Sequence, residues 1–203
     1  MKLDRSFYLR EDVVQVSREL LGKYLYSFKD GLFTGGIITE TEAYAGALDK
    51  ASHAHGNRRT ARTEIMFKQG GTAYVYLCYG IHSLLNVVTN QEGTPHAVLI
   101  RALFPTDGIA IMQKRRKSVK TGSALTTGPG TVSTALGIHY SDTGKDLLNQ
   151  EIWIEDKGLK IPDEQVVTGP RIGIDYAEED ALLPYRFRVK QGFLNSLDIE
   201  THS

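Results

Sequence analysis

The apolar residues near the N-terminus recur at the spacing of an amphipathic helix. Within residues 11–21, Val13, Val16 and Leu20 stand at positions i, i+3 and i+7, so they share one face of a helix. Gly22 follows this stretch directly, and glycine commonly ends helices because it adopts the left-handed backbone conformation without strain. The pattern therefore predicts a helix that buries one face.

Alternating apolar positions predict the strands of a sheet. Residues 23–28 and 32–42 flank Asp30 and Gly31, a pair that is typical of a tight hairpin turn. Residues 43–71 are polar, rich in glycine, arginine and histidine, and lack a period, which indicates loop and short helix, where binding groups tend to lie. Shorter apolar runs predict further strands at residues 72–79, 84–89, 98–103, 151–155, 171–174 and 185–190.

Two further helices are expected between these strands. Thr106 or Asp107 can cap a helix that runs to about Lys117, and the glycine-rich residues 126–131 lead into a short helix that ends near Gly137. No repeat, linker or low-complexity segment divides the chain. We therefore expect one α+β domain.

Composition mainly excludes classes of protein. The 203 residues include 24 basic and 24 acidic side chains, 41% hydrophobic residues and one cysteine, Cys78. These values fit a globular protein without an internal disulfide. The first ten residues lack the apolar stretch of a secretory signal, and no apolar run approaches the roughly 18 residues that a membrane helix needs. We therefore expect a cytoplasmic protein with no membrane association.

The zero net charge hides an uneven distribution of charge. Residues 51–120 carry 10 basic and 3 acidic side chains, a balance of +7, whereas residues 121–203 carry 7 and 13, a balance of −6. Because phosphate contacts act over short distances, a local basic segment can hold a polyanion although the chain as a whole is neutral. The alternative is a basic face that acidic neighbours balance in the fold.

Two groups of residues carry candidate chemistry. The sequence lacks phosphate-binding glycine loops, serine-hydrolase motifs, zinc-protease motifs and paired CxxC motifs, which disfavours nucleotide-dependent, redox and zinc chemistry. Glu40 and Glu42 lie two apart on a predicted strand, so they share a face as a carboxylate pair, unless both face water at a strand edge. Tyr74 and Tyr76 share a face of another strand, where they could stack on bases or fill the core.

The order of these groups resembles the alkyladenine (3-methyladenine) DNA glycosylase family. The similarity covers nearly the whole chain, and it implies a single DNA glycosylase domain over residues 1–203, an α+β fold with a curved antiparallel sheet flanked by helices. The motifs that carry it are ITETEAY at 38–44, ASH at 51–53, MF at 66–67, YVYLCYG at 74–80, NV at 86–87, LIRAL at 99–103, GPG at 128–130 and GPRIG at 169–173.

At matching positions the resemblance implies a base-flipping site. Glu42 would be the general base that activates water against the sugar carbon C1′, and Arg101 would help to hold that water and the carboxylate. Tyr44 on one side, with His53 and Tyr76 on the other, would sandwich the extruded base. The reaction would be hydrolysis of the N-glycosidic bond of a damaged purine in DNA.

The resemblance also implies the contacts with the duplex and the range of partners. Tyr79 would wedge into the duplex, and Asn86 would oppose the 2-amino group of guanine. The expected partner is double-stranded DNA with damaged purines, bound by a monomer without cofactor or metal and without strand cleavage. Two departures from the family pattern stand out: Thr131 occupies a position where lysine is frequent, and no proline follows Gly192.

Two other functions stay open on the sequence alone. A metal-dependent hydrolase could use Glu40, Glu42, His53 and His55, because the His-x-His spacing lets two imidazoles meet one cation in an extended segment. A catalytically inactive lesion-binding protein would have the same pocket but would not require Glu42.

Overall fold

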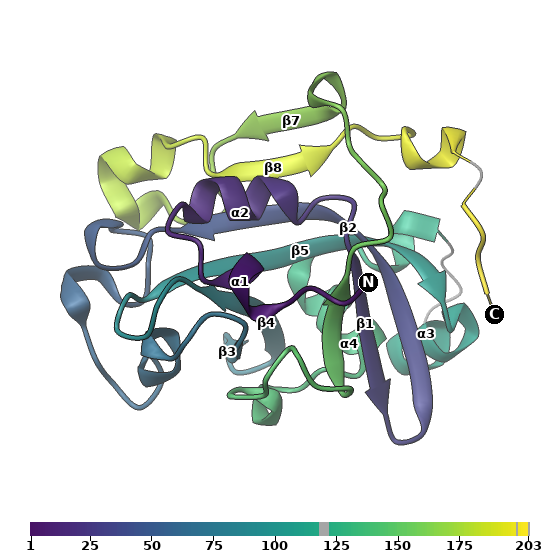
Figure 1. Ribbon diagram of the computed structural model, residues 1–203, viewed down its shortest axis with the longest axis horizontal. Helices are drawn as coiled ribbons and strands as arrows, with labels where there is room; N and C mark the ends of the chain where they lie inside the picture. The colour runs from purple at the N-terminus through teal and green to yellow at the C-terminus, as the bar shows by residue number, and fades with distance from the viewer. Residues whose placement is uncertain (118–121, 198, 203) are drawn as a thin grey trace.

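An antiparallel sheet that curls into a half-barrel forms the centre of the molecule, as the computed structural model shows for residues 1–117, 122–197 and 199–202 (Figure 1). β8 (Arg186–Val189) pairs with the second half of β2 (Leu32–Tyr44), and β7 (Val166–Gly169) pairs with β8. The expected α+β fold with a curved antiparallel sheet is confirmed. Across the main path the strands follow the order β3 (Ala73–Cys78), β4 (His82–Thr89), β5 (His96–Asp107), β2 (Leu32–Tyr44), β1 (Tyr24–Lys29) and β6 (Ile152–Glu155).

β2 holds the sheet together because it pairs along both edges. One edge pairs with β5 from Gly35 to Tyr44. The other edge pairs first with β1, up to Ile37, and then with β8 at Glu40, Thr41 and Glu42. Register shifts on both sides of Glu40 in the pairing with β5 mark an irregularity typical of a β-bulge. Glu40 and Glu42 therefore lie where three strands run side by side, and the alternative that both face water at a strand edge is wrong.

The predicted hairpin between β1 and β2 is confirmed. Asp30 and Gly31 have backbone φ angles of 54° and 74°. Two successive left-handed residues are what a two-residue type I′ turn requires, and its twist matches the twist of the strands that it joins.

The predicted N-terminal helix is present as α2 (Val13–Glu19), slightly shorter than expected. The side chain of Asp12 accepts the backbone N–H of Gln15 and so caps the helix. Val16 and Leu20 have no exposed surface, so the apolar face is buried as the spacing predicts. α2 packs against β2 and β5 and lies in front of β2 in Figure 1.

The other helices are short and cover the remaining sides of the sheet. α4 (Pro129–Leu136) packs against β4 and β5 and against α3 (Ile109–Arg116), and Gly137 ends it as expected. The three 3-10 helices within residues 43–71 agree with the prediction of loop and short helix. The further helices are α1 (Arg5–Tyr8), α3 (Ile109–Arg116), α4 (Pro129–Leu136), η1 (Gly46–Leu48), η2 (His55–Asn57), η3 (Glu64–Phe67), η4 (Gly122–Leu125), η5 (Tyr140–Asp142), η6 (Asp163–Gln165), η7 (Asp175–Leu182) and η8 (Leu194–Ser196).

The predicted cap of the helix before Lys117 is wrong. Thr106 and Asp107 are the last residues of β5, where Asp107 pairs with Gly35 of β2. The helix starts only after Gly108, whose φ of 66° turns the chain out of the strand. Pairing with β2 has extended the strand beyond the apolar run that predicted it.

The predicted strand over residues 171–174 is also wrong. The strand of this region is β7, which comes before it, and Gly173, with φ of 73°, turns the chain. The backbone N–H of Ile172 donates to the side chain of Glu42 instead of to a neighbouring strand, and Arg171 is buried. Residues 171–174 thus form a cover over β2 at Glu42.

A single large apolar core connects the two ends of the chain. It draws buried residues from Leu3 to Leu194 and includes residues of α2, α4 and most of the strands. None of the helices in the described ranges combines the length and the apolar character that crossing a membrane requires.

Candidate active site

A cavity of about 430 Å³ opens beside the ends of β2, β3, β4 and β5, and this volume lies in the usual range for small-molecule pockets. Six of the seven residues that the sequence singled out line it, and Glu42 lies directly beneath. The lining consists of Tyr44, Ala51, His53, Arg62, Met66, Tyr74, Tyr76, Leu77, Cys78, Tyr79, Leu84, Asn86, Ala97, Leu99, Arg101, Pro129, Ile172, Gly173, Ile174 and Tyr176.

Glu42 is held by three donors from three parts of the chain. Its Oε1 accepts the backbone N–H of Ile172 at 2.8 Å. Its Oε2 accepts the Tyr44 hydroxyl at 2.9 Å and the Arg101 guanidinium at 3.3 Å. All three donors line the cavity, whereas Glu42 itself has no exposed surface. These three donors therefore separate the Glu42 carboxylate from the cavity.

Burial and these donors act on the pKa of Glu42 in opposite directions. Burial raises the pKa because it disfavours the charged form, whereas Arg101, Ile172 and Tyr44 stabilise the carboxylate. Burial prevails, and the pKa of Glu42 lies above its ordinary value of 4.5. A carboxylate with a raised pKa is a stronger base than one at the surface.

Arg101 binds both glutamates and so offsets part of the repulsion between them. Its Nε donates to Glu40 at 3.1 Å, while its Nη1 reaches Glu42. Glu40 also accepts from Arg186 of β8 at 3.3 Å. Glu40 lines a different cavity, of about 290 Å³, and is not part of the wall of the first. The two carboxylates therefore differ in surroundings although they share a face of β2.

The geometry does not favour the hydrolase alternative. Arg101 lies between Glu40 and Glu42, and Arg186 also pairs with Glu40, so the two carboxylates have two positive countercharges without a metal ion. His55 is exposed in η2, whereas His53 packs among tyrosines. Within the described ranges, no three His, Cys, Asp or Glu side chains are grouped so that they could hold a metal ion.

One wall of the cavity is aromatic. The ring of His53 meets Tyr76 edge-on, with centroids 4.7 Å apart and planes at 84°, and Tyr74 stacks on Tyr76 at 5.5 Å. Nδ1 of His53 lies 2.8 Å from the Tyr74 hydroxyl. Burial, and then the charge of Arg62, lower the pKa of His53 to about 4, so the imidazole is neutral at physiological pH. Tyr44 also lines the cavity, and its own hydroxyl is engaged by Glu42.

Tyr79 lies at the tip of the turn between β3 and β4. Its side chain is 92% exposed, and its φ of 50° is unusual for a residue other than glycine. The turn thus presents the aromatic side chain of Tyr79 to solvent at the rim of the cavity.

Asn86 lies deep in the cavity and is fixed there. It is 4% exposed, and its Nδ2 donates to the backbone carbonyls of Tyr74 at 3.1 Å and Leu84 at 3.3 Å. A side chain tied to the backbone in this way presents a constant shape to a molecule in the cavity.

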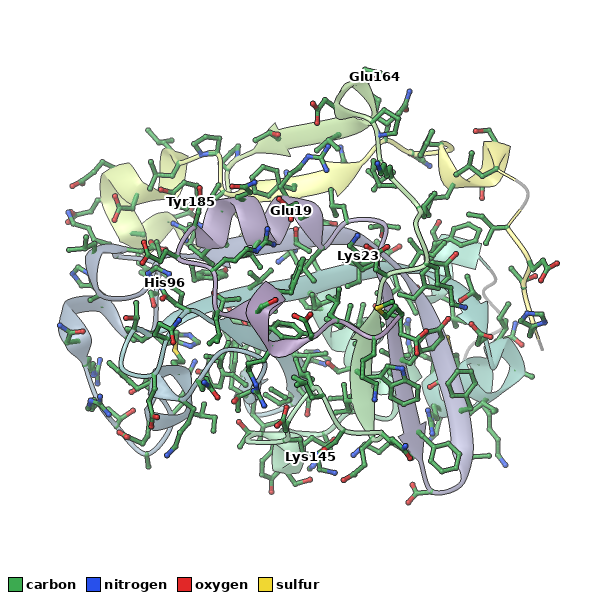
Figure 2. All side chains as sticks on the ribbon, viewed as in Figure 1. Glu19, Lys23, His96, Lys145, Glu164 and Tyr185 are labelled. Carbon is green, nitrogen blue, oxygen red and sulfur yellow. The ribbon has the colours of Figure 1, made fainter. Side chains whose placement is uncertain are left out.

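The sequence interpretation missed Arg171, which positions the cover over Glu42. Arg171 is fully buried, pairs with both carboxylate oxygens of Asp49 at 2.5 and 2.8 Å, and donates to the carbonyl of Ala43. Its guanidinium also lies 4.8 Å from the ring of Tyr44 and 5.3 Å from that of Tyr185, which directly precedes β8 and is labelled in Figure 2. The GPRIG motif contains this arginine but gives no sign of its partner.

The two departures from the family pattern lie outside this cavity. The hydroxyl of Thr131 bonds to the backbone carbonyls of Thr127 and Gly128 at the start of α4. After Gly192 the chain turns, with φ of 87°, into η8. Neither residue touches the aromatic wall or Glu42.

Comparison with known proteins agrees with this arrangement. Relatives named "Putative 3-methyladenine DNA glycosylase" include one from Chlamydia felis, 46% identical over 91% of this chain and 94% of its own length. Those from Bacillus cereus and Alkaliphilus oremlandii are 47% and 44% identical, over 92% and 94% of this chain and 95% and 96% of their own lengths. The family model for methylpurine-DNA glycosylase matches residues 6–192. The chain belongs to the methylpurine-DNA glycosylase family.

Proposed function

We propose that this protein removes alkylated or deaminated purines from duplex DNA by hydrolysing their N-glycosidic bond. The observation that carries the proposal is the buried carboxylate of Glu42 beneath an aromatic cavity, with Arg101 and Tyr44 between the two. The extruded base would lie between Tyr44 and the wall of His53 and Tyr76. The substrate class would include 3-methyladenine, 7-methylguanine, hypoxanthine and ethenoadenine.

The chemistry of the bond explains why a carboxylate is needed. Its cleavage passes through an oxocarbenium-like state, and a nearby negative charge stabilises that state and can take a proton from water. Since Oε2 of Glu42 accepts from Tyr44 and Arg101 and has no exposed surface, we expect water to reach it when a bound nucleotide shifts one of these side chains. Binding of the extruded nucleotide would thus open the Glu42 carboxylate to the attacking water.

The cavity also suits the leaving group. Purine nucleotides methylated at N3 or N7 carry a positive charge, which aromatic faces attract, and such bases leave without a general acid. Aromatic contacts and a side chain that fills the vacated space can offset the few kcal/mol that extrusion of a base costs. Among the residues that the structure describes, none of those lining the cavity is a lysine that could form a Schiff base, so we expect hydrolysis that leaves the DNA strand intact.

The direct test is release of base from duplexes that each carry one of the four lesions. We expect free base and an uncut strand with an abasic site, at the same rate in excess chelator. Loss of activity in chelator would favour the metal-dependent alternative. Tight lesion binding without release, in wild type and in Glu42→Gln alike, would favour a binding protein without catalysis.

Replacing Tyr79 tests the proposed wedge. Tyr79→Ala should leave the melting temperature almost unchanged, since the side chain is exposed. It should weaken retention of the flipped base by about 1 to 3 kcal/mol, the scale of one base–aromatic stack. Binding of lesion duplexes and thermal melting check the two expectations. Unaltered lesion binding would show that Tyr79 does not fill the duplex.

Replacing Asn86 tests the proposed exclusion of guanine. Asn86→Ser should raise release of guanine-derived bases relative to adenine-derived ones, because a smaller side chain leaves room for the 2-amino group. The change in this ratio should correspond to no more than about 1 to 3 kcal/mol of activation free energy, the usual limit for steric exclusion of one group. A ratio of 7-methylguanine to 3-methyladenine release that equals the wild-type value would contradict this role.

A further inference from the structure

Arg62 reaches into the aromatic wall of the cavity from the loop before η3. Its guanidinium carbon lies 4.7 Å from the centre of the Tyr76 ring, a cation–π distance. Its Nη2 lies 2.6 Å from Nε2 of His53, and its Nε donates to the Tyr74 hydroxyl at 3.3 Å. In the free protein, the planar guanidinium of Arg62 therefore already contacts the aromatic wall against which the extruded base is proposed to lie.

This cation differs from the other one in the cavity wall because no acid balances it. Arg101 is paired with Glu40 and Glu42. None of the ion pairs found within the described ranges includes Arg62, whereas the neighbouring Arg59 is paired with Glu64 at 2.8 Å. Because the imidazole of His53 is neutral, the aromatic wall carries one unbalanced positive charge.

From this arrangement we infer that Arg62 determines specificity by disfavouring cationic bases relative to neutral ones. The inference rests on the proposed function and concerns only which purines the cavity prefers. A cationic alkylpurine has to share the Tyr76 ring with the guanidinium or displace it, and in either position the two like charges repel. A neutral purine such as hypoxanthine meets the same guanidinium without repulsion.

The bias has a chemical consequence for a site that accepts several lesions. Cationic purines have the weaker glycosidic bonds, so a site with aromatic walls alone would release them far faster than neutral ones. A fixed positive charge at the wall narrows this difference, and it keeps the cavity available for neutral lesions.

The test compares Arg62→Gln with Arg59→Gln. Both substitutions remove one positive charge from the same loop and one cation–π contact, since Arg59 lies over Phe67, but only Arg62 lines the cavity. Release of 3-methyladenine and of hypoxanthine is measured under single-turnover conditions in the same duplex sequence. Neither base has a 2-amino group, so exclusion by Asn86 does not enter the ratio.

We expect Arg62→Gln to raise the ratio of 3-methyladenine to hypoxanthine release by about tenfold, which corresponds to roughly 1.4 kcal/mol. Arg59→Gln should lower both rates through weaker DNA binding and leave the ratio unchanged. An unchanged or lowered ratio in Arg62→Gln, or an equal change in both variants, would overturn the inference.

A second readout separates this inference from the proposed function. In Arg62→Gln the dissociation constant of the 3-methyladenine duplex should fall relative to that of the hypoxanthine duplex, with or without hydrolysis, because the cationic base is no longer repelled. A wild-type protein that binds both duplexes and releases neither base would overturn the proposed function alone. If the ratio of the two dissociation constants is the same in wild type and in Arg62→Gln, the inference is overturned, whatever the release rates are.

Discussion

Glu42→Gln should lower single-turnover base release by roughly 10² to 10⁴-fold, the usual contribution of a general base. The amide keeps the size of the side chain, and its oxygen can still accept the N–H of Ile172. The segment of residues 171–174 therefore keeps its hydrogen bond to residue 42. It removes the negative charge that would stabilise the oxocarbenium-like state and take the proton from water. Lesion binding, measured in parallel, should change little.

Glu40→Gln is the matched control. It makes the same chemical change two residues away on the same strand, and Glu40 lines a different cavity. Its amide oxygen can still accept Nε of Arg101, so release should stay within about tenfold of wild type. Equal losses from the two substitutions, or wild-type rates in Glu42→Gln, would refute the assignment of the general base.

The identity of the lesion adds a further expectation for Glu42→Gln. Cationic 3-methyladenine leaves with less help than neutral hypoxanthine. The variant should therefore retain a larger fraction of wild-type release with 3-methyladenine than with hypoxanthine. Equal fractional losses would argue against stabilisation of the developing positive charge by Glu42.

The raised pKa of Glu42 also predicts how release depends on pH. Only the ionised carboxylate can act as a base, so release should decline as the pH falls through the pKa of Glu42, which lies above 4.5. This acidic limb should disappear from the residual release of Glu42→Gln. A limb that persists unchanged in the variant would belong to another group.

Asp49→Asn should reduce the free energy of unfolding by about 3 to 5 kcal/mol, the usual effect of breaking a buried ion pair from one side. Asp49 is 3% exposed and Arg171 is fully buried, so the substitution leaves a buried guanidinium without a countercharge. A loss of this size is a large part of the 5 to 15 kcal/mol typical of a whole domain. Urea unfolding followed by circular dichroism measures it.

Asp163→Asn provides the comparison, because it breaks an aspartate–arginine pair at the surface. Asp163 is paired with Arg18 at 2.6 Å, but its side chain is 98% exposed, so water and salt already screen it. We expect the free energy of unfolding of Asp163→Asn to differ little from that of wild type. A loss in Asp49→Asn no larger than in Asp163→Asn would mean that the buried pair does not hold the cover in place.

Local patterns predicted most elements of this fold, because those elements depend on neighbouring residues. The helical spacing of Val13, Val16 and Leu20 and the Asp30–Gly31 turn are examples. Local patterns failed where a distant partner decides the conformation. The strand expected at residues 171–174 is absent, since Arg171 pairs with Asp49, 122 positions earlier in the chain.

The site shows the same limit. The family motifs drew attention to residues around the cavity, and the structure brings them together. Arg62 was not singled out, because a single arginine in a polar loop has no periodic or motif signal. Tyr74 was noted as a strand residue, but its hydrogen bond to His53 depends on how the loop folds over β3. The unbalanced charge in the aromatic wall becomes visible only in three dimensions.

The donors that surround Glu42 come from widely separated parts of the chain, and this separation determines when the site can form during synthesis. Arg101 follows Glu42 by 59 positions and Ile172 by 130 positions. A chain that emerges from the ribosome, N-terminus first, presents Glu42 long before Ile172 exists. Partly made chains therefore lack the donors around Glu42, and under the proposed function only nearly complete molecules would attack glycosidic bonds in nearby nucleic acid.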